Sequence, residues 1–120
     1  MNRAFINLVA FVSLIGATSG GGDLARGGSL LVFGAGAVSC GTWLGHAQPE
    51  DADHVVMASW VDGYLTAANQ KLIEDGQTAS LGQDTQGTGR DAWISRYCKA
   101  NPQDPLFRAA SALVLDLAKR

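Results

Sequence analysis

The stretch PEDADHVVMASWVDGYLTAANQKLIED, residues 49–75, decides the fold. Apolar side chains recur in it every three to four residues, which predicts one long amphipathic helix. Pro49 suits the first helical position, the acidic residues behind it favour the positive end of the helix dipole, and Gly76 is a stop signal. Two adjacent stripes run along this helix: Val56, Trp60, Tyr64, Ala67 and Lys71, and Met57, Val61, Leu65, Ala68 and Leu72. A face of this width is typical of the central helix of a small bundle.

Two shorter helices are expected after a loop. Residues 76–90 are rich in glycine, which predicts a surface loop that serves either as a linker or as a binding segment. The next helix is expected to begin near Asp91, with residues 88–91 as a capping box, and to end at residues 101–102. Asp104 is expected to cap the last helix, with Pro105 at its first position. Since no segment alternates as a strand does, the expected fold class is all-α, a bundle of three main helices.

The first 38 residues differ in composition from the rest and hold eight of the fifteen glycines. The uncharged run over residues 4–17, fourteen residues long, follows Arg3 and predicts a secretory signal peptide, too short for a transmembrane helix. Cleavage is expected near residues 17–19, or after residues 35–37 if residues 26–37 are the working signal. An N-terminal helix of the domain and a lipoprotein modified at Cys40 are the alternatives. We therefore expect a periplasmic protein with a leader over residues 1–38, a single domain over residues 39–120 and no stable membrane insertion after cleavage.

Cys40 and Cys98 are the only cysteines. An even number of cysteines in an exported protein favours a disulfide. For a pair 58 positions apart, the chain-entropy model gives about 4 kcal/mol of stabilisation. That amount matters because a domain this small has a marginal core. Two free thiols acting as ligands or nucleophiles are the alternative.

Composition and motifs disfavour several function classes. A formal charge of −2 disfavours a nucleic-acid-binding surface, and 47% hydrophobic residues disfavour a disordered chain. No nucleophile elbow, phosphate-binding loop or dinucleotide motif is present, and no catalytic set can be assembled. We therefore expect no enzyme, no cofactor and no metal. A site made by His46, His54 and an Asp is the metal alternative, although histidines near a helix start are usually surface residues.

Five aromatic residues form two pairs at helical spacing and one neighbour of the first cysteine: Trp60 and Tyr64, Trp93 and Tyr97, and Trp43. They predict either a core cluster packed around the disulfide or a partly exposed binding patch. Gly63 lies in the middle of the long helix, where it costs about 1 kcal/mol relative to Ala. We expect a closely packed neighbour or a bend there.

Three motifs carry a family resemblance: SCGTW at residues 39–43, WVDGYL at residues 60–65, and YCKANP at residues 97–102. They resemble those of the small exported bacterial proteins of the HdeA/HdeB-like group, over about residues 39–117. This resemblance implies a helical fold with one disulfide. The best-known members of that group are periplasmic acid-stress chaperones, dimeric at neutral pH, in which acid exposes apolar surface that holds unfolding clients. A homodimer is therefore one form that the resemblance implies here.

Gly63-Tyr64-Leu65 is similar to a helix motif of a second group, the Tai-type immunity proteins, which block amidase toxins delivered between bacteria. Val61 stands where those proteins have a cysteine of a second bridge. Either resemblance implies a non-catalytic protein with a protein partner. That partner is a set of unfolded clients in the first case and one cognate toxin in the second.

Overall fold

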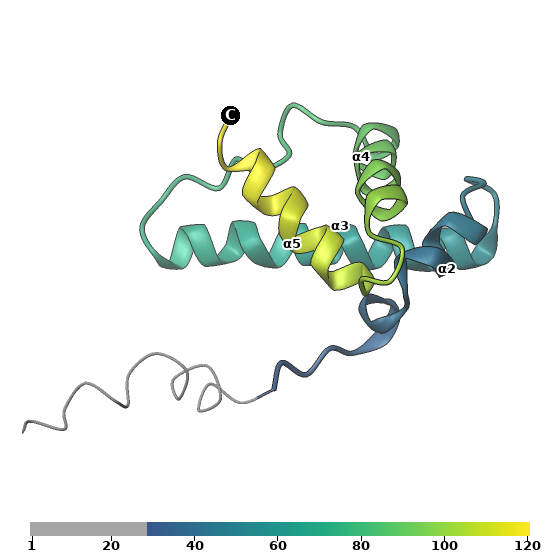
Figure 1. Ribbon diagram of the computed structural model, residues 1–120. Helices are drawn as coiled ribbons and strands as arrows, with labels where there is room; N and C mark the ends of the chain where they lie inside the picture. Colours follow the sequence, from purple (N-terminus) through teal and green to yellow (C-terminus); the bar gives the residue numbers. More distant parts are fainter. Residues whose placement is uncertain (1–28) are drawn as a thin grey trace, which may run out of the picture. The chain divides into compact units, whose positions relative to one another are not determined.

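The computed structural model describes residues 29–120, which contain four α-helices, one 3-10 helix and no named strand (Figure 1). The elements are η2 (Gly34–Ala37), α2 (Cys40–Gly45), α3 (Ala52–Glu74), α4 (Gly87–Ala100) and α5 (Leu106–Leu117). The all-α class and the Cys40–Cys98 disulfide are therefore confirmed. Within the described residues, no helix is long and apolar enough to cross a bilayer. The predicted signal peptide lies almost wholly outside the described residues.

The long helix α3 begins at Ala52 and not at Pro49, which lies in the preceding turn. The reason is Asp51, whose side chain accepts hydrogen bonds from the backbone N–H groups of Asp53 and His54 and so caps the helix. Of the two predicted stripes, one is buried and includes Met57, Val61 and Leu65. The other faces outward: Val56 is 60% exposed, and Trp60 and Tyr64 are half-buried. All the buried residues of α3 lie in its first two thirds, where α5 crosses it (Figure 1).

The starts of α4 and α5 differ from the prediction. Helix α4 begins at Gly87, before Asp91, and its N-cap Gln86 makes no side-chain cap, so the expected capping box over residues 88–91 does not set the start. Helix α5 begins at Leu106 with Pro105 as its N-cap. Asp104, the expected cap, instead accepts a hydrogen bond of 2.6 Å from the Tyr97 hydroxyl. In both cases the aspartate expected in the cap instead bonds to a side chain of another helix: Asp91 to His54 on α3, and Asp104 to Tyr97 on α4.

The disulfide lies at a junction that brings together the start of α2 and the loop between α4 and α5. Both cysteines are fully buried. The Cys40 N–H donates to the Asp104 carbonyl at 2.7 Å, and the Leu106 N–H donates to the Val38 carbonyl at 2.8 Å. Helix α2 was not predicted, because six residues are too few to show a period. The largest fully buried side chains are Trp43, Ile94, Leu106, Leu113 and Val61.

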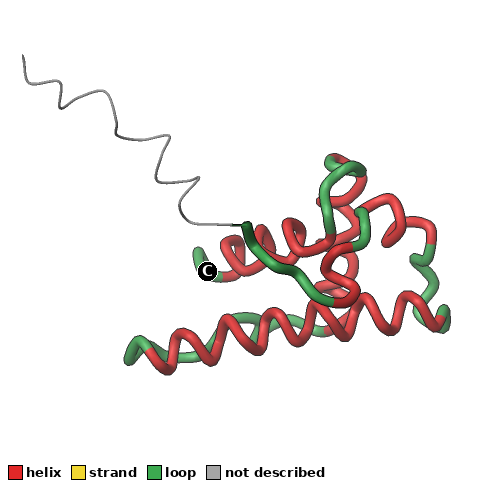
Figure 2. The backbone as a smooth tube through the Cα atoms, turned by 90° about the horizontal axis from the view of Figure 1, so that it is seen from below, coloured by secondary structure: helices red, strands yellow, loops and turns green. Residues whose placement is uncertain are grey.

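Residues 32–38 pack on the same unit, although the sequence placed them in the leader. The compact unit runs from Val32 to Arg120. Gly36 is buried beside the Trp60 ring, and the Trp60 indole N–H donates to the Phe33 carbonyl at 2.9 Å. In Figure 2 the segment before η2 is the green tube that continues from the grey trace. Cleavage after Ala37 would remove this packed turn, whereas cleavage near residues 17–19 would keep it.

The expected close packing at Gly63 is wrong. A Cβ atom at this position would meet no atom of another described element within 4 Å, and α3 runs along its length without a sharp bend (Figure 1). Gly63 is exposed, so its small size serves no contact among the described residues.

We predict opposite effects for two glycine-to-alanine substitutions. Gly63→Ala should raise the free energy of unfolding by about 1 kcal/mol, because Ala has the higher helix propensity and open space around it. Gly36→Ala should lower it by about 1–3 kcal/mol, because the new methyl group collides with the Trp60 ring. Urea denaturation followed by circular dichroism measures both. Equal effects of the two substitutions would contradict this packing.

The double variant Cys40→Ser/Cys98→Ser should lose about 3–5 kcal/mol of unfolding free energy, because the unfolded chain is released from a loop of 58 residues. Reduction of the wild-type protein should give the same loss, measured by thermal denaturation with and without reductant. An unchanged midpoint on reduction would show that the bridge does not stabilise the fold.

Candidate functional site

The five predicted aromatic residues lie in three places. Trp43 is fully buried, and its indole N–H donates to the Ser95 hydroxyl on α4 at 2.9 Å. Trp60 and Tyr64 form a pair on α3, with ring centroids 5.5 Å apart, and Trp93 and Tyr97 form a stacked pair on α4, with centroids 6.0 Å apart. All four paired rings are half-buried against the core. The core that contains Trp43 and both cysteines therefore has all four paired rings packed against it.

His54 is buried and joins α3 to α4. It is 5% exposed, so the expectation of a surface position is wrong for this histidine. Its Nε2 atom lies 2.9 Å from an Asp91 carboxylate oxygen, and its ring lies 4.9 Å from the Trp43 ring. Its Nδ1 atom is buried and has no hydrogen-bond partner among the described residues. No local pattern could predict this pair, because Asp91 lies 37 positions away from His54.

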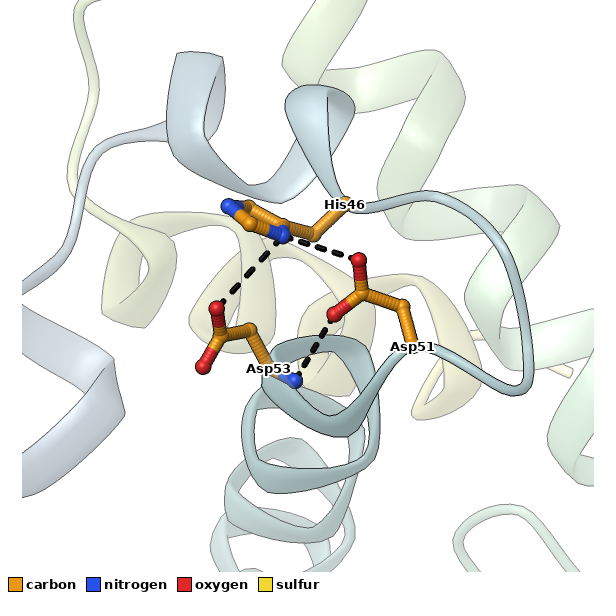
Figure 3. A group of neighbouring side chains, drawn as sticks. All are labelled: His46, Asp51 and Asp53. Carbon is orange, nitrogen blue, oxygen red and sulfur yellow. Dashed lines mark hydrogen bonds and ion pairs between the residues drawn. The ribbon is translucent and has the colours of Figure 1, made fainter.

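A second histidine joins the end of α2 to the start of α3 (Figure 3). His46 Nδ1 lies 3.0 Å from an Asp51 carboxylate oxygen and 3.6 Å from one of Asp53. The hydrogen bond to Asp51 raises the pKa of His46, and the Asp51 and Asp53 charges act in the same direction. The same bond, together with the backbone N–H groups that Asp51 caps, holds the pKa of Asp51 below its usual value. The group thus binds a proton on His46 in mildly acidic solution.

These three residues could also hold a metal ion. One nitrogen of His46 and one oxygen each of Asp51 and Asp53 lie within 4.8 Å of one another. Nitrogen and carboxylate ligands suit zinc and similar divalent cations. His54 does not belong to this set, so the site considered from the sequence, with both histidines, does not form. Because His46 Nδ1 binds either a proton or a metal, any metal binding here would weaken in acid.

Besides the disulfide and its apolar core face, helix α4 is tied to α2, α3 and the loop before α5 by four side-chain hydrogen bonds, three of which use an aspartate. Beyond the His54–Asp91 pair, Arg90 on α4 pairs with Asp62 on α3 at 3.0 Å. The Tyr97 hydroxyl donates to Asp104, and this bond raises the pKa of the Tyr97 phenol. The fourth tie is the neutral hydrogen bond between Trp43 and Ser95. Both side-chain ties between α4 and α3 in the described residues therefore use an aspartate carboxylate.

A scan against protein-family models, a search of the curated proteins and a search of the solved structures each found no match to this chain. The function must therefore be argued from the contacts of the site.

The ion pair of His46 should stabilise the protein only in a limited pH range. Asp51 has a lowered pKa in the folded state, so its contribution is present above the ordinary value near 3.8 and is lost as pH falls through the folded pKa. His46 has a raised pKa, so its contribution is complete below 6.5 and is lost as pH rises through the folded pKa. His46→Gln should therefore lower stability most between about pH 4 and 6.5.

The measurement is the unfolding free energy by urea denaturation from pH 3 to pH 9. Asp53→Asn is the control, because it removes the more distant carboxylate and leaves the His46–Asp51 hydrogen bond in place. A constant difference between His46→Gln and wild type across this range would refute the ion-pair interpretation.

Proposed function

We propose that this chain is an exported, non-catalytic binding protein that acts as an acid-stress chaperone. The observation that carries the proposal is the pair of aspartate contacts, His54–Asp91 and Arg90–Asp62, that ties α4 to α3. Acid removes these contacts, while the disulfide and the apolar core are indifferent to pH. The export step is supported by the disulfide, since disulfides persist in oxidising compartments.

The first step of the proposed response is loss of these contacts. Near pH 2 to 3 most aspartates are protonated, so Asp62 and Asp91 no longer neutralise their partners. Residues 39–120 contain ten acidic and seven basic residues and two histidines. Their net charge changes from −3 near neutrality to about +9 near pH 2. Self-repulsion of this size loosens a small domain.

The second step is the separation of α3 from the other helices. The disulfide joins α2 to α4, and the backbone bonds of Cys40 and Leu106 join the start of α2 to the loop before α5. None of these links crosses to α3. When the two aspartate ties break, the weakened boundary is the one between α3 and the α2–α4–α5 unit. The surfaces that this separation exposes are apolar: Met57, Val61 and Leu65 on α3, and Leu106, Ala110 and Leu113 on α5.

The third step is recovery. The disulfide keeps the closed unit of α2, α4 and α5 joined while α3 is displaced. A chain that retains this link has less conformational entropy to lose on refolding. Neutralisation restores the carboxylates and with them both ties to α3, so bound clients would be released as the apolar stripe is covered again.

The direct test is a light-scattering assay of an unrelated aggregating client protein at pH 2.5 and pH 7. The proposal expects this protein to reduce scattering at pH 2.5 and not at pH 7. Asp62→Asn/Asp91→Asn removes the carboxylate charge of both ties at every pH, so protection should begin about one pH unit nearer neutrality. Asp116→Asn is the control, because Asp116 pairs with Arg120 at the chain end and does not tie α4 to α3.

Two results would overturn the proposal. One is an absence of protection at pH 2.5, and the other is equal protection at both pH values. In either case the alternative, an immunity protein that binds one toxin at neutral pH, becomes the first candidate, and a pull-down at pH 7 would be the next experiment.

A further inference from the structure

A cavity of about 410 Å³ opens between the start of α4 and the end of α5. Three of the four arginines in the described residues line it: Arg90, Arg96 and Arg120. Asp84 is the only acidic residue on its wall. The lining therefore carries a net positive charge, although the protein as a whole is acidic. Of the charged groups used in the proposed acid response, Arg90 alone lines this cavity.

The three guanidinium groups differ in how firmly they are held. Arg90 is 17% exposed, pairs with Asp62 and also donates to Thr85, so its position is fixed. Arg120 pairs with Asp116 at 3.0 Å. Arg96 is exposed and forms no ion pair with another described residue. Arg96 therefore has its charge and its donors available for an anionic ligand.

The remaining walls combine a weak positive potential with apolar surface. Thr88 and Gly89, in the first turn of α4, line the cavity, and the N-cap of this helix provides no side-chain acceptor. The positive end of the helix dipole adds to the charge of the arginines. On the other side lie Trp93, Leu113 and Leu117, which suit an apolar group. The volume is at the lower end of the range for small-molecule sites, enough for one or two side chains.

We propose that this cavity binds a carboxylate carried on an apolar body, such as the C-terminal residue of a peptide or a small aromatic acid. Arg96 and Arg120 bind the carboxylate, and Trp93 contacts the apolar body. Guanidinium groups match a planar carboxylate with paired hydrogen bonds. This binding is a property of the protein at neutral pH and does not depend on the proposed chaperone activity. It is lost in acid, because protonation of the ligand removes its charge.

The experiment is a titration at pH 7 followed by the indole N–H signals in ¹⁵N-labelled protein, assigned with Trp93→Phe. The probes are N-acetylphenylalanine, its uncharged amide, and a tripeptide that ends in phenylalanine. We expect the Trp93 signal to shift with the two acids and not with the amide. The Trp43 and Trp60 signals should not shift, because their N–H groups are bonded to Ser95 and Phe33.

Two arginine variants test the assignment. Arg96→Gln should weaken binding of both acids by about fivefold, as expected for one partly exposed charge-assisted contact. Arg108→Gln is the matched control, since Arg108 is the one arginine of the described residues that does not line the cavity. The affinity of this variant for both acids should equal that of wild type. Tighter binding of the tripeptide than of the amino-acid derivative indicates a peptide ligand, and equal binding indicates a small acid.

Three outcomes would overturn the proposal. They are a Trp93 shift with the amide as large as with the acid, equal weakening by Arg96→Gln and Arg108→Gln, and no shift with either acid at millimolar concentration. Circular dichroism of each variant establishes that it is folded before it is compared.

Discussion

The fold depends on one closure, between the start of α2 and the loop that joins α4 to α5. A disulfide between residues 58 positions apart and backbone hydrogen bonds on both sides of it hold this closure. The N–H group of Cys40 is used by the Asp104 carbonyl, and Ser39 pairs with Pro105 as an isolated bridge. Helix α3 packs its buried stripe of Met57, Val61 and Leu65 into the same core, mainly against α5 and η2.

The bundle therefore has two kinds of boundary, which respond differently to pH. The boundary inside the α2–α4–α5 unit is covalent, backbone-bonded and apolar, and the charged group that takes part in it is Asp104, which accepts the Tyr97 hydroxyl. The boundary toward α3 combines an apolar stripe with the two aspartate pairs of His54 and Arg90. Both side-chain ties of the second boundary use a carboxylate, whereas the first boundary also has a disulfide and backbone hydrogen bonds that do not depend on protonation. The proposed acid response therefore begins at the boundary between α3 and the α2–α4–α5 unit, whereas plain unfolding would loosen both boundaries together.

The sequence was sufficient for features that depend on local pattern, and insufficient for those that depend on distant partners. The 3–4 spacing located α3 and α5, and the even cysteine count indicated the disulfide. The helix starts were wrong where a carboxylate had a distant partner: Asp104 bonds to Tyr97, and Asp91 bonds to His54. The predicted surface position of His54 failed for the same reason. Nothing in the spacing of Arg90, Arg96 and Arg120 could show that they line one cavity, because Arg120 reaches it from another helix end.

Arg90 connects the two proposals physically, since it lines the cavity and also pairs with Asp62 across the α3 boundary. At neutral pH three carboxylates lie near the cavity arginines: Asp62, Asp84 and Asp116. Strong acid removes the negative charge of carboxylates in general, including that of a bound ligand. Of the cavity arginines on α4, Arg90 lies near its N-terminal end, whereas Arg96 lies two residues before Cys98, where the disulfide holds the helix. The proposed separation of α4 from α3 therefore begins at the end of α4 that carries Arg90. An anion bound in the cavity opposes this separation for as long as the anion keeps its charge.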